Sequence, residues 1–111
     1  MLNVTGRAGD HVTARLPEDV DLHTTPGLCA VVNRIIDEGC RHLTLDASAL
    51  RHLDSTGVTA FLAWYQRLAP PGGTLTLTGL TGHPQTMLTR MGLHRALTIT
   101  PDTPSGDTAG P

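Results

Sequence analysis

Residues 43–65 read LTLDASALRHLDSTGVTAFLAWY, and this stretch decides the fold class that we assign to the chain. Its start is short and apolar, so residues 42–46 are expected to form a central strand buried on both faces. After a connection, the corner Asp54-Ser55-Thr56-Gly57 opens into an amphipathic helix. A buried strand followed by such a helix is the repeating unit of an α/β protein. The apolar residues of the helix recur at the spacing of one helical face: Val58, Phe61, Leu62, Tyr65, Leu68 and Ala69.

The residues before this stretch begin with a predicted β-hairpin. Residues 2–5 and 11–16 are candidate strands, and the glycines between them indicate a turn. Pro17 ends the second strand, because proline cannot donate a backbone hydrogen bond to a sheet. An acidic turn is expected to follow, at Glu18-Asp19-Val20-Asp21.

A first helix is predicted between this turn and the central strand. Thr24 or Thr25 can cap the helix, and Pro26 suits its first turn. Gly39 marks its end, as glycine does just past many helices. Its apolar face is expected to comprise Leu28, Val31, Val32, Ile35 and Ile36.

After the stretch, a strand, a third helix and a final strand are predicted. The run Pro70-Pro71-Gly72-Gly73 ends the second helix, and residues 74–78 alternate between threonine and leucine as a strand does. Pro84 starts the third helix, which closes at Gly92. Residues 93–97 are interpreted as a last turn and residues 98–100 as a final strand. Residues 101–111 are nearly free of apolar side chains and are expected to be disordered.

This order of elements predicts one α/β domain over residues 1–100 with a disordered tail over residues 101–111. Helices that connect successive strands imply a mostly parallel sheet, to which the hairpin adds an antiparallel strand. Functional residues of such sheets tend to lie at the carboxyl ends of the strands. Two acidic loops fit that position, residues 17–25 and residues 47–57.

The composition narrows the possible functions. Hydrophobic residues make up 39% of the chain and charged residues 16%, as in a soluble globular protein. No apolar run approaches the ~20 residues of a membrane span, and no signal-peptide pattern is present, so a cytoplasmic protein without membrane insertion is expected. The eight basic residues are all arginines, which excludes lysine Schiff-base chemistry and a Walker-type phosphate loop. A net charge of −2 without a basic cluster argues against nucleic acid as a partner.

The cysteines and histidines show no metal-ligand spacing. Cys29 and Cys40 match no metal or redox motif, and we interpret them as reduced, structural thiols. Neither a metal site nor a cofactor is predicted. The scattered histidines are interpreted as surface or strand-end residues: His11, His23, His42, His52, His83 and His94.

The motif Leu53-Asp54-Ser55-Thr56-Gly57-Val58 resembles the I/L-D-S-S/T-G-L corner of the STAS family, the bacterial anti-anti-sigma factors (anti-sigma factor antagonists). Asp19-Val20-Asp21, the strand end at Asp46 and residues 73–78 are similar to other parts of the family pattern. Residues 87–99 resemble its C-terminal ending, so the resemblance covers roughly residues 10–100. It implies a single STAS-like domain: a mixed, mostly parallel sheet of four to five strands with helices packed on one side.

The resemblance also implies a phosphorylation switch in a partner-switching pathway that regulates transcription. In phospho-regulated members, an anti-sigma factor that is also a serine kinase phosphorylates the serine after the corner aspartate, which here is Ser55. The unphosphorylated form captures the kinase, phosphorylation with ATP bound by the kinase ends the capture, and a serine phosphatase restores it. The chain would be a substrate and not an enzyme, with no catalytic residue of its own. Its partner-binding surface would comprise Asp21, Asp54, Ser55, Thr56, Gly57 and Val58.

A second function stays open within the same family: a regulatory subunit of a membrane transporter, acting as an interaction scaffold without a phospho-switch. The retained corner favours the first function. One departure from the family pattern affects the neighbourhood of Ser55. Glu18, preceded by Pro17, stands where a glycine usually opens the acidic turn, so the turn gains an acid that a kinase would encounter.

Considered without the resemblance, the corner allows three interpretations. Asp54, Ser55 and Thr56 are favoured helix caps, each worth about 1 kcal/mol, and could serve only in that role. Alternatively, a phosphate on Ser55 would lie near free backbone N–H groups at the positive end of the helix. Ser55 could also be a catalytic nucleophile, which requires a nearby base, and His52 is the only histidine near it in the sequence.

Two further residues have a predicted role in partner binding. Gly57 is expected to leave the first turn of the second helix uncovered, so that a partner can approach its backbone closely. Trp64 lies just off the apolar face of the same helix. It is interpreted either as the edge of the core or as an anchor for a partner.

Overall fold

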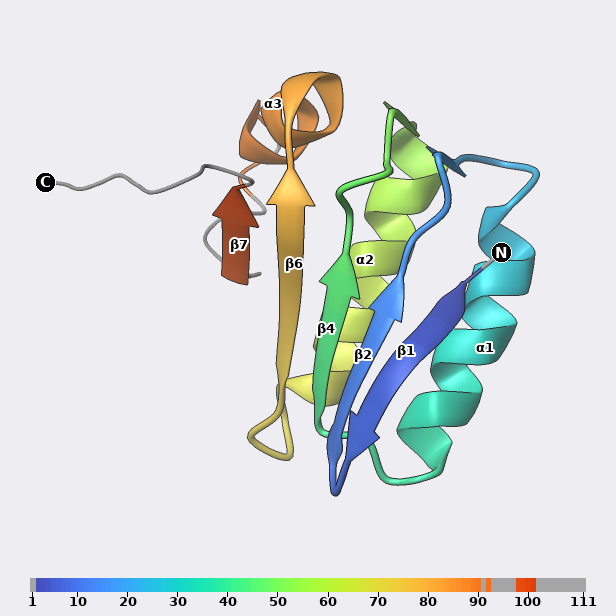
Figure 1. Cartoon of the computed structure of the whole chain (residues 1–111), viewed down its shortest axis with the longest axis vertical. Helices are drawn as coiled ribbons and strands as arrows, with labels where there is room; N and C mark the ends of the chain where they lie inside the picture. Colours follow the sequence, from blue (N-terminus) through green and yellow to red (C-terminus); the bar gives the residue numbers. More distant parts are fainter. Residues whose placement is uncertain (1, 91, 93–97, 102–111) are drawn as a thin grey trace, which may run out of the picture.

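The computed structural model describes residues 2–90, 92 and 98–101 (Figure 1). Its elements follow the predicted α/β order, except that two short strands form where a turn (residues 19–20) and a connection (residues 52–53) were predicted. The strands are β1 (Asn3–Ala8), β2 (His11–Arg15), β3 (Asp19–Val20), β4 (His42–Asp46), β5 (His52–Leu53), β6 (Thr74–Leu80) and β7 (Thr98–Pro101). The helices are α1 (Thr25–Asp37), α2 (Ser55–Leu68) and α3 (Gly82–Arg90). Within this described part, no helix combines the length and the apolar character needed to cross a membrane.

The main sheet has five strands in the order β1-β2-β4-β6-β7. β1 pairs antiparallel with β2, as the predicted hairpin requires, and the other neighbours pair in parallel. Helices α1 and α2 lie on one face of this sheet, whereas α3 lies beyond the carboxyl end of β6 (Figure 1). The prediction of a mixed, mostly parallel sheet with helices on one side is confirmed.

The two faces of the sheet differ because equivalent residues of β2, β4 and β6 stand side by side. Toward the helices, Leu43 pairs with Val12 and Leu75, and all three side chains are buried. On the opposite face, His42, Thr44 and Asp46 of β4 are only half-buried. The prediction that residues 42–46 are buried on both faces is therefore wrong. The opposite face consists of the rows His11–His42–Thr74, Thr13–Thr44–Thr76 and Arg15–Asp46–Thr78.

Helix α1 has the predicted apolar face but not the predicted cap. Leu28, Val32 and Ile35 are buried, and Gly39 ends the helix region with a φ of 108°. The N-cap residue is Thr24, yet its side chain makes no capping hydrogen bond. The Thr24 hydroxyl instead bonds to the loop before the helix, as described below.

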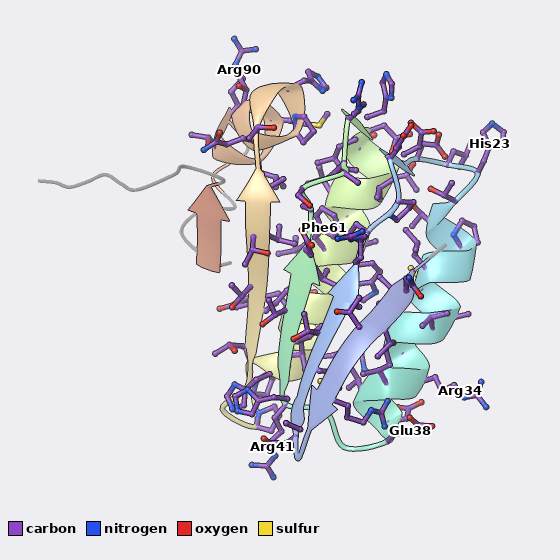
Figure 2. The ribbon with its side chains drawn as sticks, viewed as in Figure 1. His23, Arg34, Glu38, Arg41, Phe61 and Arg90 are labelled. Carbon is purple, nitrogen blue, oxygen red and sulfur yellow. The ribbon has the colours of Figure 1, made fainter. Side chains whose placement is uncertain are left out.

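The aromatic residues of α2 lie in the core. Trp64 is 1% exposed, Phe61 is fully buried, and their ring centroids are 5.5 Å apart. Figure 2 shows Phe61 in the layer between the sheet and α2. Burial of a large apolar side chain contributes about 1.5–3 kcal/mol, so these rings help to fix α2 on the sheet. Trp64 is a core residue and does not reach a partner.

The remaining predictions concern the C-terminal part and the thiols. The turn predicted at residues 93–97 and most of the predicted tail, residues 102–111, lie outside the described residues. Pro101 was assigned to that tail but is the last residue of β7. Cys29 and Cys40 are free thiols, as predicted. Burial raises the pKa of the Cys40 thiol, which suits a structural role.

Candidate functional site

The two acidic loops meet at the carboxyl ends of β2 and β4. In the chain, β3 follows β2 and β5 follows β4. β3 and β5 pair in parallel, with Asp19 opposite His52 and Val20 opposite Leu53. The backbone N–H of Asp54 then donates to the carbonyl oxygen of Val20 at 3.2 Å. This short ladder places the corner that opens α2 beside the loop that leads into α1.

Asp54 is the residue that joins these two loops. It is the N-cap of α2, and its Oδ1 accepts a hydrogen bond from the backbone N–H of Gly57 at 3.1 Å. Its Oδ2 accepts from the backbone N–H of Leu22 at 3.2 Å. Capping is therefore the task of Asp54, and the interpretation of Ser55 as the capping residue is wrong.

Replacement of Asp54 by alanine is expected to lower the free energy of unfolding by about 1–2 kcal/mol, because it removes the cap and the bond to the neighbouring loop. Asp54→Asn keeps one acceptor oxygen and should lose about half as much. Urea unfolding followed by circular dichroism measures both values. An unchanged midpoint for Asp54→Ala would mean that the corner does not depend on this carboxylate.

Ser55 is exposed at the first position of α2, and Thr56 next to it is half-buried. The Ser55 carbonyl oxygen accepts a hydrogen bond from the Thr59 hydroxyl at 2.9 Å. Its own hydroxyl has no hydrogen-bond partner within the part of the chain that the structure describes. A serine in this position is free to receive a group from outside without breaking an internal contact.

Gly57 and Val58 are buried at the start of α2, so the Val58 side chain cannot contact a partner. Val58 is 3% exposed and Gly57 is buried. A Cβ atom on Gly57 would lie 2.6 Å from Cγ1 of Val20 and 2.7 Å from Cδ1 of Leu53. The expectation that Gly57 leaves the first turn open is wrong, because the missing Cβ lets α2 pack closely against β3 and β5.

Asp21 lies in the loop before α1 and holds that loop in shape. Its Oδ1 accepts from the backbone N–H groups of Thr24 at 3.1 Å and His23 at 2.9 Å. These bonds, that of Thr24 first, lower the pKa of the Asp21 carboxyl below its usual value, so the group is ionised at neutral pH. The Thr24 hydroxyl completes the turn, since it donates to the carbonyl oxygen of Asp19 at 3.0 Å and accepts from the N–H of Asp21 at 3.0 Å.

A further carboxylate at this end of the sheet is Asp46, the last residue of β4. Hydrogen bonds from Ser48, whose backbone N–H lies 2.9 Å from Oδ1, lower the pKa of the Asp46 carboxyl. Arg15 adds a weaker attraction, with its Nε 3.6 Å from Oδ2. Asp46 and Asp21 are therefore both ionised at neutral pH, and Arg15 balances part of the charge of Asp46.

Glu18, which replaces the glycine of the family pattern, lies at the start of the β3–β5 ladder. The Glu18 side chain is exposed, while its carbonyl oxygen accepts from the backbone N–H groups of Arg51 at 2.8 Å and His52 at 3.0 Å. These two hydrogen bonds extend the β3–β5 ladder at its start. An acid at this position therefore adds charge to the surface beside the ladder.

Two features of the site were not predicted from the sequence. Leu22 is 65% exposed and sits on the loop that Asp54 holds. An apolar residue in a polar turn, outside any helical or strand periodicity, was the signal that could have identified it. His52 forms a pair with Asp19, with Nδ1 2.8 Å from Oδ1. Within the described residues, His52 makes no hydrogen bond to Ser55, so His52 is not placed as a base for the Ser55 hydroxyl.

Comparison with known proteins agrees with this fold. A family model described as "Mlab, STAS domain" matches residues 4–100. An anti-sigma factor antagonist from Mycobacterium paratuberculosis superimposes with a TM-score of 0.81 at 20% identity, covering 91% of this chain and 85% of that one. A putative anti-sigma factor antagonist from Thermotoga maritima superimposes with a TM-score of 0.82 at 17% identity, covering 93% of this chain and 87% of that one. The Bacillus cell fate determinant SpoIIAA in its phosphorylated form superimposes with a TM-score of 0.72 at 18% identity, covering 92% of this chain and 93% of that one.

The sheet order, the corner before α2 and the family match together define the class of protein. The chain belongs to the STAS domain family.

Proposed function

We propose that this protein is an anti-sigma factor antagonist that captures an anti-sigma factor with serine kinase activity and is released when that kinase phosphorylates Ser55. The observation that carries the proposal is the exposed Ser55 hydroxyl at the first position of α2, beside a cap that Asp54 already provides. The names of similar structures support it, since they include anti-sigma factor antagonists and a phosphorylated form. In this role the chain is a cytoplasmic substrate, and the ATP is bound by its partner.

The switch follows from local electrostatics. A phosphate on Ser55 adds about −1.5 to −2 charges at neutral pH. The backbone N–H groups of the first turn of α2 stabilise it within the protein. Asp54 and Asp21 already supply negative charge to the same surface. Phosphorylation therefore needs no change of fold, because it turns a binding surface into a repulsive one.

The proposed binding surface comprises the exposed parts of both loops. Ser55, Thr56, Asp54 and Asp21 provide its polar groups, and Leu22 provides an exposed apolar contact at its edge. Protein interfaces commonly combine apolar and polar side chains in this way. Gly57 and Val58 contribute indirectly, since their packing in the core sets the position of the corner.

Phosphate transfer tests the proposal. The purified protein is incubated with ATP and a candidate anti-sigma factor of the histidine-kinase-like ATPase class, and the mass of the intact protein is measured. One added phosphate on the wild type and none on Ser55→Ala is the expected result, and a serine phosphatase should remove it. A STAS-type subunit of a transporter would bind its partner without being modified. Absence of phosphate on the wild type would therefore favour that alternative.

A further inference from the structure

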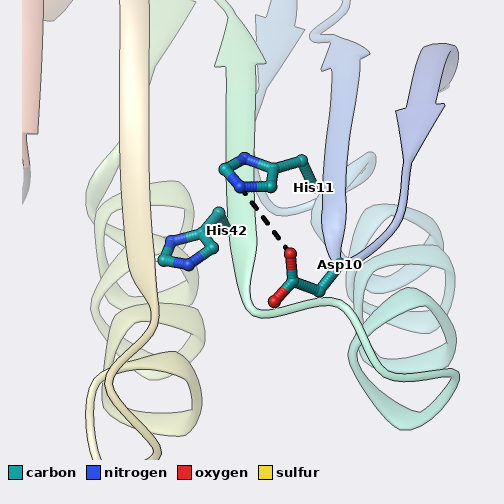
Figure 3. A group of neighbouring side chains, drawn as sticks. All are labelled: Asp10, His11 and His42. Atoms are coloured by element: carbon teal, nitrogen blue, oxygen red, sulfur yellow. Dashed lines mark ion pairs between the residues drawn. The ribbon is translucent and has the colours of Figure 1, made fainter.

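A second polar cluster lies at the amino ends of the parallel strands, away from Ser55. His11 begins β2 and His42 begins β4, and the two residues pair directly in the sheet register. Asp10, in the hairpin turn, brings a carboxylate to the same place (Figure 3). Figure 2 places His23, on the loop beside the Ser55 corner, at one end of the molecule, and Arg41, next to His42, at the other.

The three side chains are close enough to share one ion. One ligand atom from each of Asp10, His11 and His42 can be chosen so that all lie within 4.8 Å of one another. The Nε2 atom of His11 is 3.6 Å from Oδ1 of Asp10, and the two imidazole rings are stacked with centroids 4.5 Å apart. Tetrahedral zinc would bring two nitrogens to about 3.3 Å from each other, given zinc–nitrogen bonds of about 2.0–2.1 Å. Metal binding therefore requires the His11 ring to rotate out of the stacked arrangement, which its exposure allows, since 66% of its side chain is accessible.

The backbone and a neighbouring hydroxyl hold this cluster in place. Nδ1 of His42 lies 2.9 Å from the Thr74 hydroxyl oxygen, so its Nε2 is the nitrogen left for a metal. Metal-binding histidines usually have a hydrogen-bond partner on the second nitrogen, and here the Thr74 hydroxyl helps to orient the His42 ring. The carbonyl oxygen of Asp10 accepts from the N–H groups of Arg41 at 2.8 Å and His42 at 3.1 Å. These bonds keep the hairpin turn against the start of β4.

We propose that Asp10, His11 and His42 form a binding site for a divalent transition metal, most readily Zn²⁺. Two imidazoles and one carboxylate match the ligand preferences of zinc and leave the fourth tetrahedral position for water. The site could not be predicted from the sequence, because His11 and His42 are distant in the chain and only the pairing of β2 with β4 brings them together. The site is independent of Ser55, so it stands or falls separately from the function proposed above.

Calorimetric titration of the tag-free protein with zinc chloride tests the site. One Zn²⁺ per chain is expected, and His11→Gln and His42→Gln should each weaken binding at least tenfold. Thr74→Val should weaken it about tenfold while keeping all three ligands, because it removes only the group that orients His42. The matched control is His52→Gln, which removes another exposed histidine paired with an aspartate, His52 with Asp19, and should leave the affinity unchanged.

Circular dichroism of each variant separates loss of a metal ligand from loss of the fold. Because His11 is exposed, its substitution is the one least able to disturb the fold. The proposal is overturned if the wild type shows no saturable binding, or if it binds only at millimolar zinc. It is equally overturned if the double variant His11→Gln/His42→Gln binds as tightly as the wild type, or if His52→Gln abolishes binding.

Discussion

Ser55→Glu is expected to weaken binding to the anti-sigma kinase about a hundredfold, whereas Ser55→Ala should bind nearly as well as the wild type. The glutamate adds one negative charge at the first turn of α2, beside the carboxylates of Asp54 and Asp21. Like charges placed against each other in an interface cost several kcal/mol, and about 1.4 kcal/mol corresponds to a factor of ten in affinity. The measurement is a calorimetric or surface-based affinity for each variant.

Gln66→Glu is the control for this experiment. It adds the same charge to an exposed position of the same helix. It lies about 16 Å further along at 1.5 Å per residue, beyond the screening length of about 8–10 Å in ordinary buffer. Its affinity should remain that of the wild type, and the loss caused by Ser55→Glu should shrink in high salt. A hundredfold loss for both variants, or for neither, would contradict the electrostatic switch at Ser55.

Gly57→Ala is expected to lower the free energy of unfolding by about 2–3 kcal/mol, at the upper end of what overpacking a core usually costs. The added methyl would lie 2.6 Å from Cγ1 of Val20, 2.7 Å from Cδ1 of Leu53 and 2.9 Å from the carbonyl oxygen of Val20. The first two contacts are side chains that can shift, but the third is backbone. To accept the methyl, the start of α2 must move away from the β3–β5 ladder, and the Ser55 corner moves with it.

Gly27→Ala provides the comparison. Gly27 lies in the first turn of α1, and a Cβ there meets nothing within 4 Å. Alanine favours a helix by about 1 kcal/mol relative to glycine, so this variant should be neutral or slightly more stable. Urea unfolding of both variants gives the two values. If Gly57→Ala is as stable as Gly27→Ala, then Gly57 is not required by the close approach of α2 to Val20.

The fold was largely predictable because its signals are local. Helical spacing from Leu28 to Ile36, alternation in residues 74–78 and the stops at Gly39 and Pro70 each depend on a few neighbouring residues. The prediction for residues 42–46 was wrong because an apolar pair, Leu43 and Leu45, fills one face of β4 whether or not the other face is covered. How many layers cover a strand depends on the packing of distant elements.

The site was only partly predictable, for the same reason. The motif drew attention to Asp54 and Ser55, but any of its polar residues could have been the cap. Only the pairing of β3 with β5 puts the backbone of Leu22 against the second oxygen of Asp54. The same pairing places the side of Gly57 that lacks a Cβ atom against Val20. Likewise, His11 and His42 meet only because β2 and β4 are neighbours in the sheet.

The measurement that tests the central claim most directly is the position of the phosphate. After incubation with the kinase and ATP, cleavage on the C-terminal side of arginine releases residues 52–67, which contain Ser55, Thr56 and Thr59. Fragmentation of this peptide assigns the phosphate to one hydroxyl. We predict that it lies on Ser55 alone, and that Ser55→Ala yields the unmodified peptide while Thr56→Ala is phosphorylated as the wild type is. Phosphate on Thr56 or Thr59 in the wild type, or a Ser55→Ala protein modified as readily as the wild type, would contradict the proposed switch.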